Sequence, residues 1–93
     1  MKTEKERKEI AFCLHSVKGM LDFIRPSNRW RIVYGTTETV ALDDWDKEYH
    51  KIVPGEEYLF IYIGEPLMYA INVQGTSPIH ITATLMKKLA DKF

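Results

Sequence analysis

The sequence predicts an α+β fold, a two-layer sandwich whose antiparallel four-stranded meander carries an N-terminal and a C-terminal helix on one face. Apolar residues recur at steps of three and four at both ends of the chain, as in amphipathic helices. Between these ends, short segments alternate apolar and polar side chains, as strands do. Because 93 residues rarely support two hydrophobic cores, we expect one domain over residues 1–93, in the order α-β-β-(short α)-β-β-α.

The first helix is predicted over residues 3–24. Its apolar positions fall within about 120° of the helix circumference, which indicates a single core face. These positions are Ile10, Cys13, Leu14, Val17, Met20, Leu21 and Ile24. Pro26 lacks a backbone donor and disfavours helical geometry in the residue before it, so we expect the helix to end there.

A β-hairpin is predicted next. Residues 29–34 alternate, with large apolar side chains on one side, and form its first strand. Residues 35–37 are typical of a turn, and residues 38–42 form the second strand, in which Val40 and Leu42 share a face.

A short helix is predicted within residues 43–52. Asp43 or Asp44 is suited to cap it, because a carboxylate accepts hydrogen bonds from the free amides at a helix start. Trp45 and Tyr49 then lie one turn apart on the same side of this helix.

Two further strands follow the short helix. Residues 58–63 are apolar on both faces, which favours a central strand. Residues 67–74 alternate, and Leu67, Tyr69 and Ile71 are expected to share the apolar face.

The last helix is predicted to start with Ser77 as its cap and Pro78 as its first residue, since proline loses nothing where no intrahelical bond exists. An alternative is that the preceding strand continues through residues 79–82 and the helix begins near Thr82. The predicted core face consists of Ile79, Ala83, Met86, Leu89, Ala90 and Phe93.

Composition and charge exclude several classes of protein. The chain is 45% hydrophobic and 28% charged, as in ordinary folded domains, and its longest apolar run, residues 58–63, is too short to span a bilayer. A single cysteine, Cys13, fits a reducing compartment, and we expect a cytoplasmic location without a membrane span. The formal net charge is zero, but residues 1–31 are basic and residues 32–66 are acidic.

No reactive constellation is visible in the sequence. Cys13 and His15 point about 200° apart on a helix, so they cannot bind one ion from the same face. His50 and His80 stand alone, and the acidic run that begins at Asp43 lacks the glycine and the ligand spacing of an EF-hand. Nucleophile, phosphate-loop and dinucleotide motifs are absent. We therefore expect no enzyme, no metal and no cofactor.

One candidate binding surface is the sheet face with aromatic and basic side chains. Such a face could anchor a protein partner or stack the bases of single-stranded nucleic acid. Its candidate residues are Arg29, Arg31, Tyr58, Phe60 and Tyr62. The alternative is that loops or the short helix cover this face, with Trp45 and Tyr49 as the lid.

The other candidate surface is on the backs of the two long helices. Phe12 and Phe23 lie within about 20° of each other, away from the core face of the first helix, and Ile81 and Leu85 lie off the predicted core face of the last. They could form an oligomer contact, or the two helices could bury them against each other.

These observations favour a small non-enzymatic protein–protein interaction module that forms a homo-oligomer, such as a homodimer. The alternative function is single-strand nucleic-acid binding, which the zero net charge disfavours. A third hypothesis is a small-molecule sensor or enzyme around Trp45 and Tyr49, with His50 or His80 in a pocket.

Overall fold

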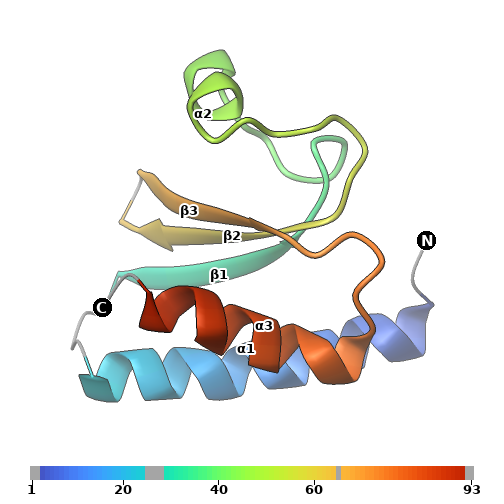
Figure 1. Cartoon of the computed structure of the whole chain (residues 1–93), viewed down its shortest axis with the longest axis vertical. Coiled ribbons are helices and arrows are strands. Elements are labelled where there is room, and N and C mark those ends of the chain that lie inside the picture. The colour runs from blue at the N-terminus through green and yellow to red at the C-terminus, as the bar shows by residue number, and fades with distance from the viewer. Residues whose placement is uncertain (1–2, 25–28, 65, 92–93) are drawn as a thin grey trace. The chain divides into compact units, whose positions relative to one another are not determined.

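The fold was analysed in a computed structural model that describes residues 3–24, 29–64 and 66–91. Predictions on Pro26 and Phe93, and on the side chains of Met20, Leu21, Ile24 and Ile79, lie outside the described residues. The described residues form three helices and one three-stranded antiparallel sheet, which confirms the α+β class (Figure 1). No helix among them is long and apolar enough to cross a membrane.

The chain divides into two compact units. The helical unit combines residues 1–28 and 76–93, and the sheet unit comprises residues 29–75. The predicted packing of both helices on one sheet face stays a prediction.

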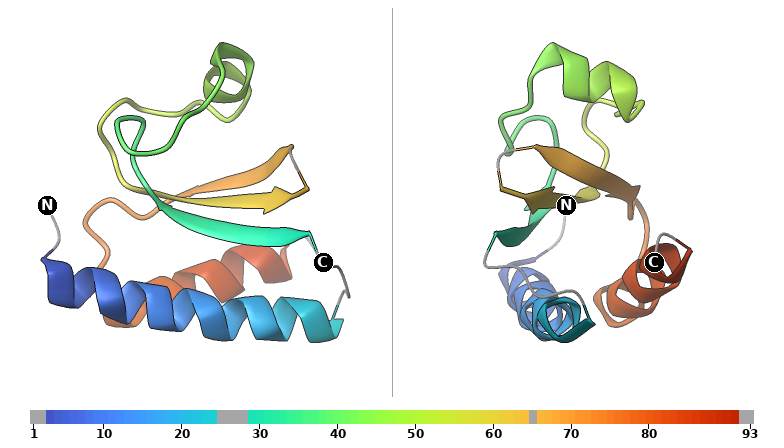
Figure 2. Two further views of the ribbon diagram at one scale, coloured as in Figure 1. Left: turned by 180° about the vertical axis from the view of Figure 1, so that it is seen from behind. Right: turned by 90° about the vertical axis from the view of Figure 1, so that its left-hand side faces the viewer.

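The helical unit contains α1 (Glu4–Ile24) and α3 (Pro78–Ala90), which lie side by side (Figure 2). A reciprocal capping box starts α1, because the Thr3 amide donates to Glu6 Oε1 at 3.0 Å and the Glu6 amide donates to Thr3 Oγ1 at 3.2 Å. Ile10, Leu14 and Val17 are buried, as the predicted core face of α1 requires. Cys13 is half-buried.

The start of α3 agrees with the sequence, but its buried face does not. Ser77 is the N-cap and Pro78 is in the first turn, so residues 79–82 are helical. Ile81, Leu85 and Leu89 are buried. Ala83 and Ala90 of the predicted core face are exposed, so the buried face lies roughly 100° around the helix from the predicted one.

The sheet unit has β1 (Trp30–Gly35), β2 (Tyr58–Ile63) and β3 (Leu67–Asn72), in the order β1-β2-β3. Both pairings are antiparallel. The predicted four-stranded meander is wrong, because residues 38–42 form turns and irregular structure instead of a strand. The strand that pairs with β1 is therefore β2.

Threonine side chains explain why residues 38–42 do not form a strand. Thr39 Oγ1 accepts from the Thr36 amide at 2.9 Å, and Thr36 Oγ1 accepts from the Glu38 amide at 3.1 Å. These local bonds satisfy backbone groups that a strand would offer to a neighbour. Gly35 permits this turn, because a Cβ there would meet Thr39 Oγ1 and Val40 Cγ2 at 2.6 Å.

A β-bulge between β2 and β3 changes which face Leu67 occupies. Ile61 pairs with Tyr69, but Tyr62 pairs with Leu67, so Met68 is the extra residue. Leu67 therefore shares a cluster with Tyr62 instead of the face of Tyr69, to which simple alternation assigned it.

Candidate interaction surfaces

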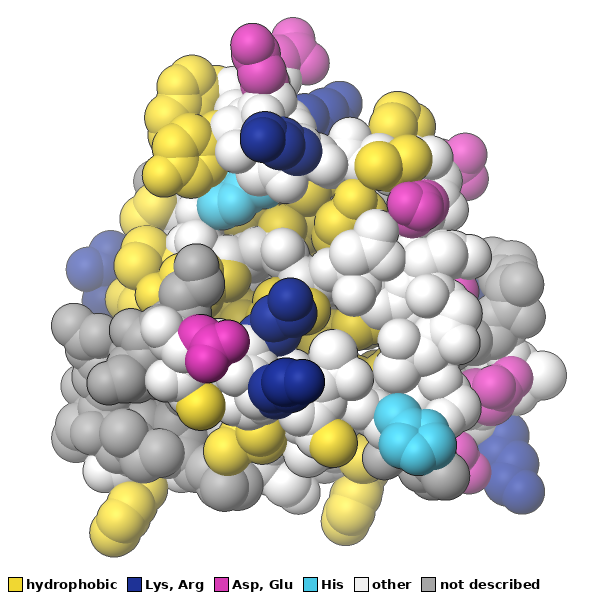
Figure 3. All heavy atoms as spheres, in the orientation of Figure 1, with side chains coloured by type: hydrophobic (Ala, Val, Ile, Leu, Met, Phe, Trp, Pro, Cys, Tyr) yellow, Lys and Arg dark blue, Asp and Glu magenta, His cyan; other side chains and the backbone are white. Residues whose placement is uncertain are grey.

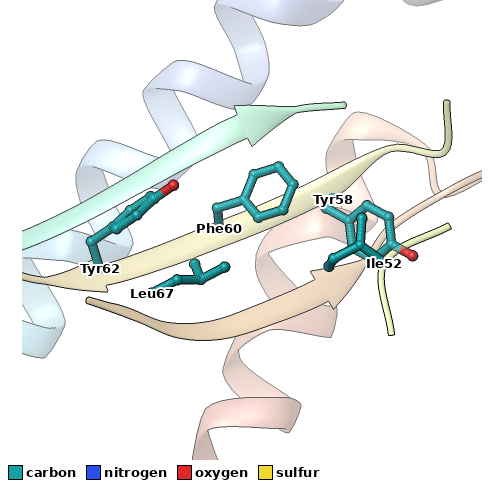
Figure 4. Packing of buried hydrophobic residues seen from close by; sticks show 5 residues of the cluster. All are labelled: Ile52, Tyr58, Phe60, Tyr62 and Leu67. Atoms are coloured by element: carbon teal, nitrogen blue, oxygen red, sulfur yellow. The ribbon is translucent and has the colours of Figure 1, made fainter. Parts of the chain in front are cut away.

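The aromatic sheet face is covered within the sheet unit. Tyr58, Phe60 and Tyr62 are 3%, 0% and 7% exposed and cluster with Ile52 and Leu67 (Figure 4). Partly buried side chains of the sheet and of the connection between β1 and β2 pack against this cluster: Val33, Val40, Leu42 and Ala70. The alternative of a covered face is therefore the one observed, and the face is part of a hydrophobic core.

The connection also satisfies the polar end of Tyr58. Its hydroxyl accepts a hydrogen bond from the Val53 amide at 2.8 Å, in a part-buried setting. A buried phenol needs such a partner, since an unpaired polar group loses its bonds to water. Farther along the same connection, the Gly55 amide donates to Thr37 Oγ1 at 3.2 Å and ties two loop segments together.

Of the two predicted arginines, Arg31 belongs to this face. Arg31 pairs with Tyr62 across β1 and β2, and its guanidinium carbon lies 4.4 Å from the centroid of the Tyr62 ring. Arg29 is exposed, and its carbonyl accepts from the Gly64 amide at 2.9 Å. The structure therefore brings Arg31 and Tyr62 together, but leaves no open row of aromatic rings.

The residues predicted to form an oligomer contact on the two long helices are exposed on α1 but buried on α3. Phe12 and Phe23 are 76% and 89% exposed, whereas Ile81 and Leu85 are both 0% exposed. Ile81 and Leu85 belong to the buried face of α3, so they are not available for an oligomer contact. The shifted core face of α3 is the reason for this correction.

The exposed surface of α1 carries Phe12, Ser16, Gly19 and Phe23, which we call the α1 outer face. Ser16 and Gly19 are exposed, and a Cβ at Gly19 would meet no atom within 4 Å. A shallow hollow beside Phe12 is lined by Lys5, Lys8, Glu9 and Cys13. Hydrophobic side chains stand out from the surface over α1 (Figure 3).

A second exposed apolar surface lies on α2 (Asp44–Tyr49), a helix whose described residues include none that is buried. Trp45 and Tyr49 are 66% and 67% exposed, and their rings stack with centroids 4.9 Å apart and planes 11° apart. They do not cover the sheet, so the predicted lid is wrong. Ile52, Val40 and Leu42 form the cover instead. The sequence shows that Trp45 and Tyr49 lie one helical turn apart, but it does not show that their side chains are exposed.

The sequence-predicted cap of α2 is confirmed at Asp43. Its Oδ1 accepts from the Asp46 amide at 2.7 Å. At the other end, His50 Nε2 lies 3.2 Å from the carbonyl oxygen of Leu67. The Asp43 bond lies within the first turn of the helix, whereas the His50 contact links the C-terminal end of the helix to β3.

Two titratable groups of the sheet unit have shifted pKa values. Burial raises the pKa of the Asp46 carboxyl, and nearby Asp43 raises it further, against the opposing effect of His50. Burial also raises the pKa of the Tyr62 phenol, while the Arg31 cation lowers it and Asp46 raises it. These shifts follow from partial removal of water and from neighbouring charges.

His80 takes part in a local contact at the start of α3. Ser77 Oγ lies 2.6 Å from His80 Nδ1, and both residues are exposed. A hydroxyl beside an imidazole resembles half of a nucleophilic triad, but these residues are three apart at a helix start, where such contacts form locally. No group of three or more metal-ligating side chains occurs in the part of the chain that the structure describes.

Comparison with known proteins gives no family for this chain: no family model matches it, and no curated protein or solved structure is significantly similar to it.

Proposed function

We propose that this chain is a cytoplasmic, non-enzymatic protein–protein interaction module that associates with a second copy of itself through the α1 outer face. The observation that carries the proposal is the exposure of Phe12 and Phe23, 76% and 89%, on one side of one helix. Large apolar side chains that share an exposed face favour association, because contact with a partner removes them from water.

The spacing of the α1 outer face supports a second copy as the partner. Phe12, Ser16, Gly19 and Phe23 are separated by four, three and four positions, which reads the same in either direction. In an antiparallel two-fold pair, Phe12 would lie opposite the partner's Phe23, and Ser16 opposite the partner's Gly19. Small residues at the centre permit close approach of the two helices, and the rings would pack on either side.

The amount of surface supports a weak dimer. Four phenylalanine rings would contribute about 6 to 12 kcal/mol if fully buried, against a cost of association of roughly 4 to 15 kcal/mol. The four rings bring roughly 600 to 1,000 Å² of buried surface, below the ~1,200 Å² of a standard stable interface. We therefore expect dimers that form at high concentration and dissociate on dilution.

Sedimentation equilibrium over a wide concentration range tests the proposal. The wild-type mass is expected to rise from 10.9 kDa toward twice that value with concentration. Phe12→Ser and Phe23→Ser should each weaken association and move the rise to higher concentration, while Ala11→Ser, an exposed position on the same helix, should leave it unchanged. A wild-type chain that remains monomeric at millimolar concentration contradicts the proposal.

Charge substitutions test the antiparallel pairing separately. In that pairing, a Phe12→Lys/Phe23→Glu chain places opposite charges together at both contacts, whereas a Phe12→Lys/Phe23→Lys chain places like charges together. The first variant should therefore dimerise more strongly than the second. In a parallel pair both variants bring like charges together. If the two variants dimerise equally weakly while the wild type dimerises, the dimer is retained but its antiparallel geometry is rejected.

Nucleic-acid binding is not retained as a second candidate. Its stacking platform would consist of Tyr58, Phe60 and Tyr62, and all three are buried among side chains of their own unit.

A further inference from the structure

The two largest side chains of α2, Trp45 and Tyr49, do not pack into a core. None of the described residues of this helix is buried; Asp43 caps its first turn, and the contact of His50 with the Leu67 carbonyl ties its C-terminal end to β3. Trp45 and Tyr49 therefore project from an element that is already fixed. Two exposed aromatic side chains on a fixed element are pre-organised for binding, because little further ordering is needed.

Three aromatic rings on and just after α2 contact one another in a row. Trp45 stacks on Tyr49, and His50 meets Tyr49 edge-on with ring centroids 4.9 Å apart and planes 80° apart. Aromatic ring faces attract cations, indole most strongly, because their π electrons carry partial negative charge.

The charge around the row favours the same kind of ligand. Residues 29–75 contain four basic and eight acidic side chains. On α2, Asp44 and Glu48 are exposed and lie one turn apart, on the side next to Trp45. Lys47 contacts Asp44 only at 4.0 Å. A cation over Trp45 would thus meet both the ring and carboxylates, whereas a phosphate would be repelled.

We propose that the Trp45–Tyr49 stack is a second binding site, which docks lysine or arginine side chains from a basic segment of another protein. The cationic group lies over the Trp45 ring, and the carboxylates of Asp44 and Glu48 bind it from the side. This site is independent of the α1 outer face and does not require self-association.

Arginine-containing and glutamate-containing peptides of the same length and glycine background provide the test. Binding is followed by the NMR signals of the two indole N–H groups. Trp30 is 3% exposed and serves as the internal reference, whereas Trp45 is exposed and should respond. We expect a saturable shift of the Trp45 signal with the arginine peptide, weaker at high salt, and none with the glutamate peptide.

Substitutions locate the site. Trp45→Ala, followed on the Tyr49 ring signals, should weaken arginine-peptide binding roughly two- to thirtyfold, as expected for loss of a cation–π contact. Trp45→Phe should retain most of the affinity, and Glu48→Gln should reduce it roughly two- to fivefold. Met68→Ala removes an apolar side chain that is 40% exposed and outside the stack, and should change nothing.

Other outcomes overturn the proposal. Equal binding of both peptides, unchanged affinity in Trp45→Ala, or a shift confined to Trp30 each shows that the stack is not a cation site. Preferential binding of a single-stranded oligonucleotide would assign the surface to a different class of ligand. Because Phe12→Ser leaves α2 intact, a monomeric Phe12→Ser chain that still binds the arginine peptide separates this site from self-association.

Discussion

The guanidinium carbon of Arg31 lies 4.4 Å from the ring centroid of Tyr62, directly across the β1–β2 pair. Arg31 is exposed while Tyr62 is 7% exposed, so the arginine covers the open side of a buried ring. Burial raises the pKa of the Tyr62 phenol, and the Arg31 cation partly offsets this increase. One contact thus contributes to both packing and ionisation.

Replacing Arg31 by alanine is expected to reduce the free energy of unfolding by about 0.5 to 1 kcal/mol, the range of an exposed cation–π contact. It should also raise the pKa of Tyr62 further, because the stabilising cation is gone. Urea denaturation and a pH titration of the Tyr62 ring by NMR measure the two effects. Arg31→Lys keeps the charge, and its Tyr62 pKa should stay closer to that of the wild type.

Raising the pH should destabilise the fold through Tyr62. Its pKa is raised in the folded state, so the unfolded chain loses this proton first as the pH passes the ordinary phenol pKa of about 10. Stability therefore falls as the pH rises through this window. In Tyr62→Phe the alkaline decrease should be smaller than in the wild type, as measured by urea denaturation between pH 8 and 11. An identical pH dependence in both chains would contradict the assignment.

Asp46→Asn should raise the stability at pH 7. The Asp46 pKa is raised above the ordinary value of 3.8, so the folded state holds this proton more tightly than the unfolded state, and ionisation costs stability as the pH rises through that window. The gain from Asp46→Asn should vanish near pH 3, where the wild-type carboxyl is protonated in both states. Thermal melts at the two pH values measure it, and a gain of equal size at both would contradict the mechanism.

Gly64 and Gly55 offer a matched pair of substitutions. Both have positive φ, +70° and +82°, so alanine at either position costs about 1 to 2 kcal/mol in backbone conformation. A Cβ at Gly64 would also overlap the guanidinium group of Arg29, while one at Gly55 would meet no atom within 4 Å. The overlapped atoms end a flexible, exposed side chain that can move aside, so Gly64→Ala should be at most about 0.5 kcal/mol more destabilising than Gly55→Ala, and Gly64→Ala/Arg29→Ala should lose that difference. A much larger loss for Gly64→Ala in urea denaturation would show that Arg29 cannot move aside.

Two phenylalanines with opposite burial test the division between core and surface. Phe60→Ala should cost about 3 to 5 kcal/mol, because Phe60 is 0% exposed within the aromatic cluster. Phe12→Ala, at 76% exposure, should change the stability of the dilute monomer by less than about 0.5 kcal/mol. Urea denaturation at low protein concentration measures both, and a small effect of Phe60→Ala would mean that the sheet face is open.

Elements whose local signals agree could be predicted from the amino-acid sequence alone. The apolar periodicity of α1 identified Ile10, Leu14 and Val17 as buried and left Phe12 and Phe23 outside. The caps of α2 and α3 were also readable, because capping depends on a few neighbouring residues. Alternating side chains located β1 and β3, and an uninterrupted apolar run located β2, for the same reason.

Features that depend on contacts between residues distant in sequence could not be predicted and became visible only in the folded chain. On α3 two apolar faces were available, and packing buries Ile81 and Leu85 rather than Ala83. One bulge reversed the face of Leu67, since a single extra residue inverts the alternation. The cover over Tyr58 and Phe60 comes from residues 40–52, and no local pattern states which segment will occupy a given face. This is why the aromatic sheet face is core, while Phe12, Phe23, Trp45 and Tyr49 are the exposed aromatic side chains proposed for binding.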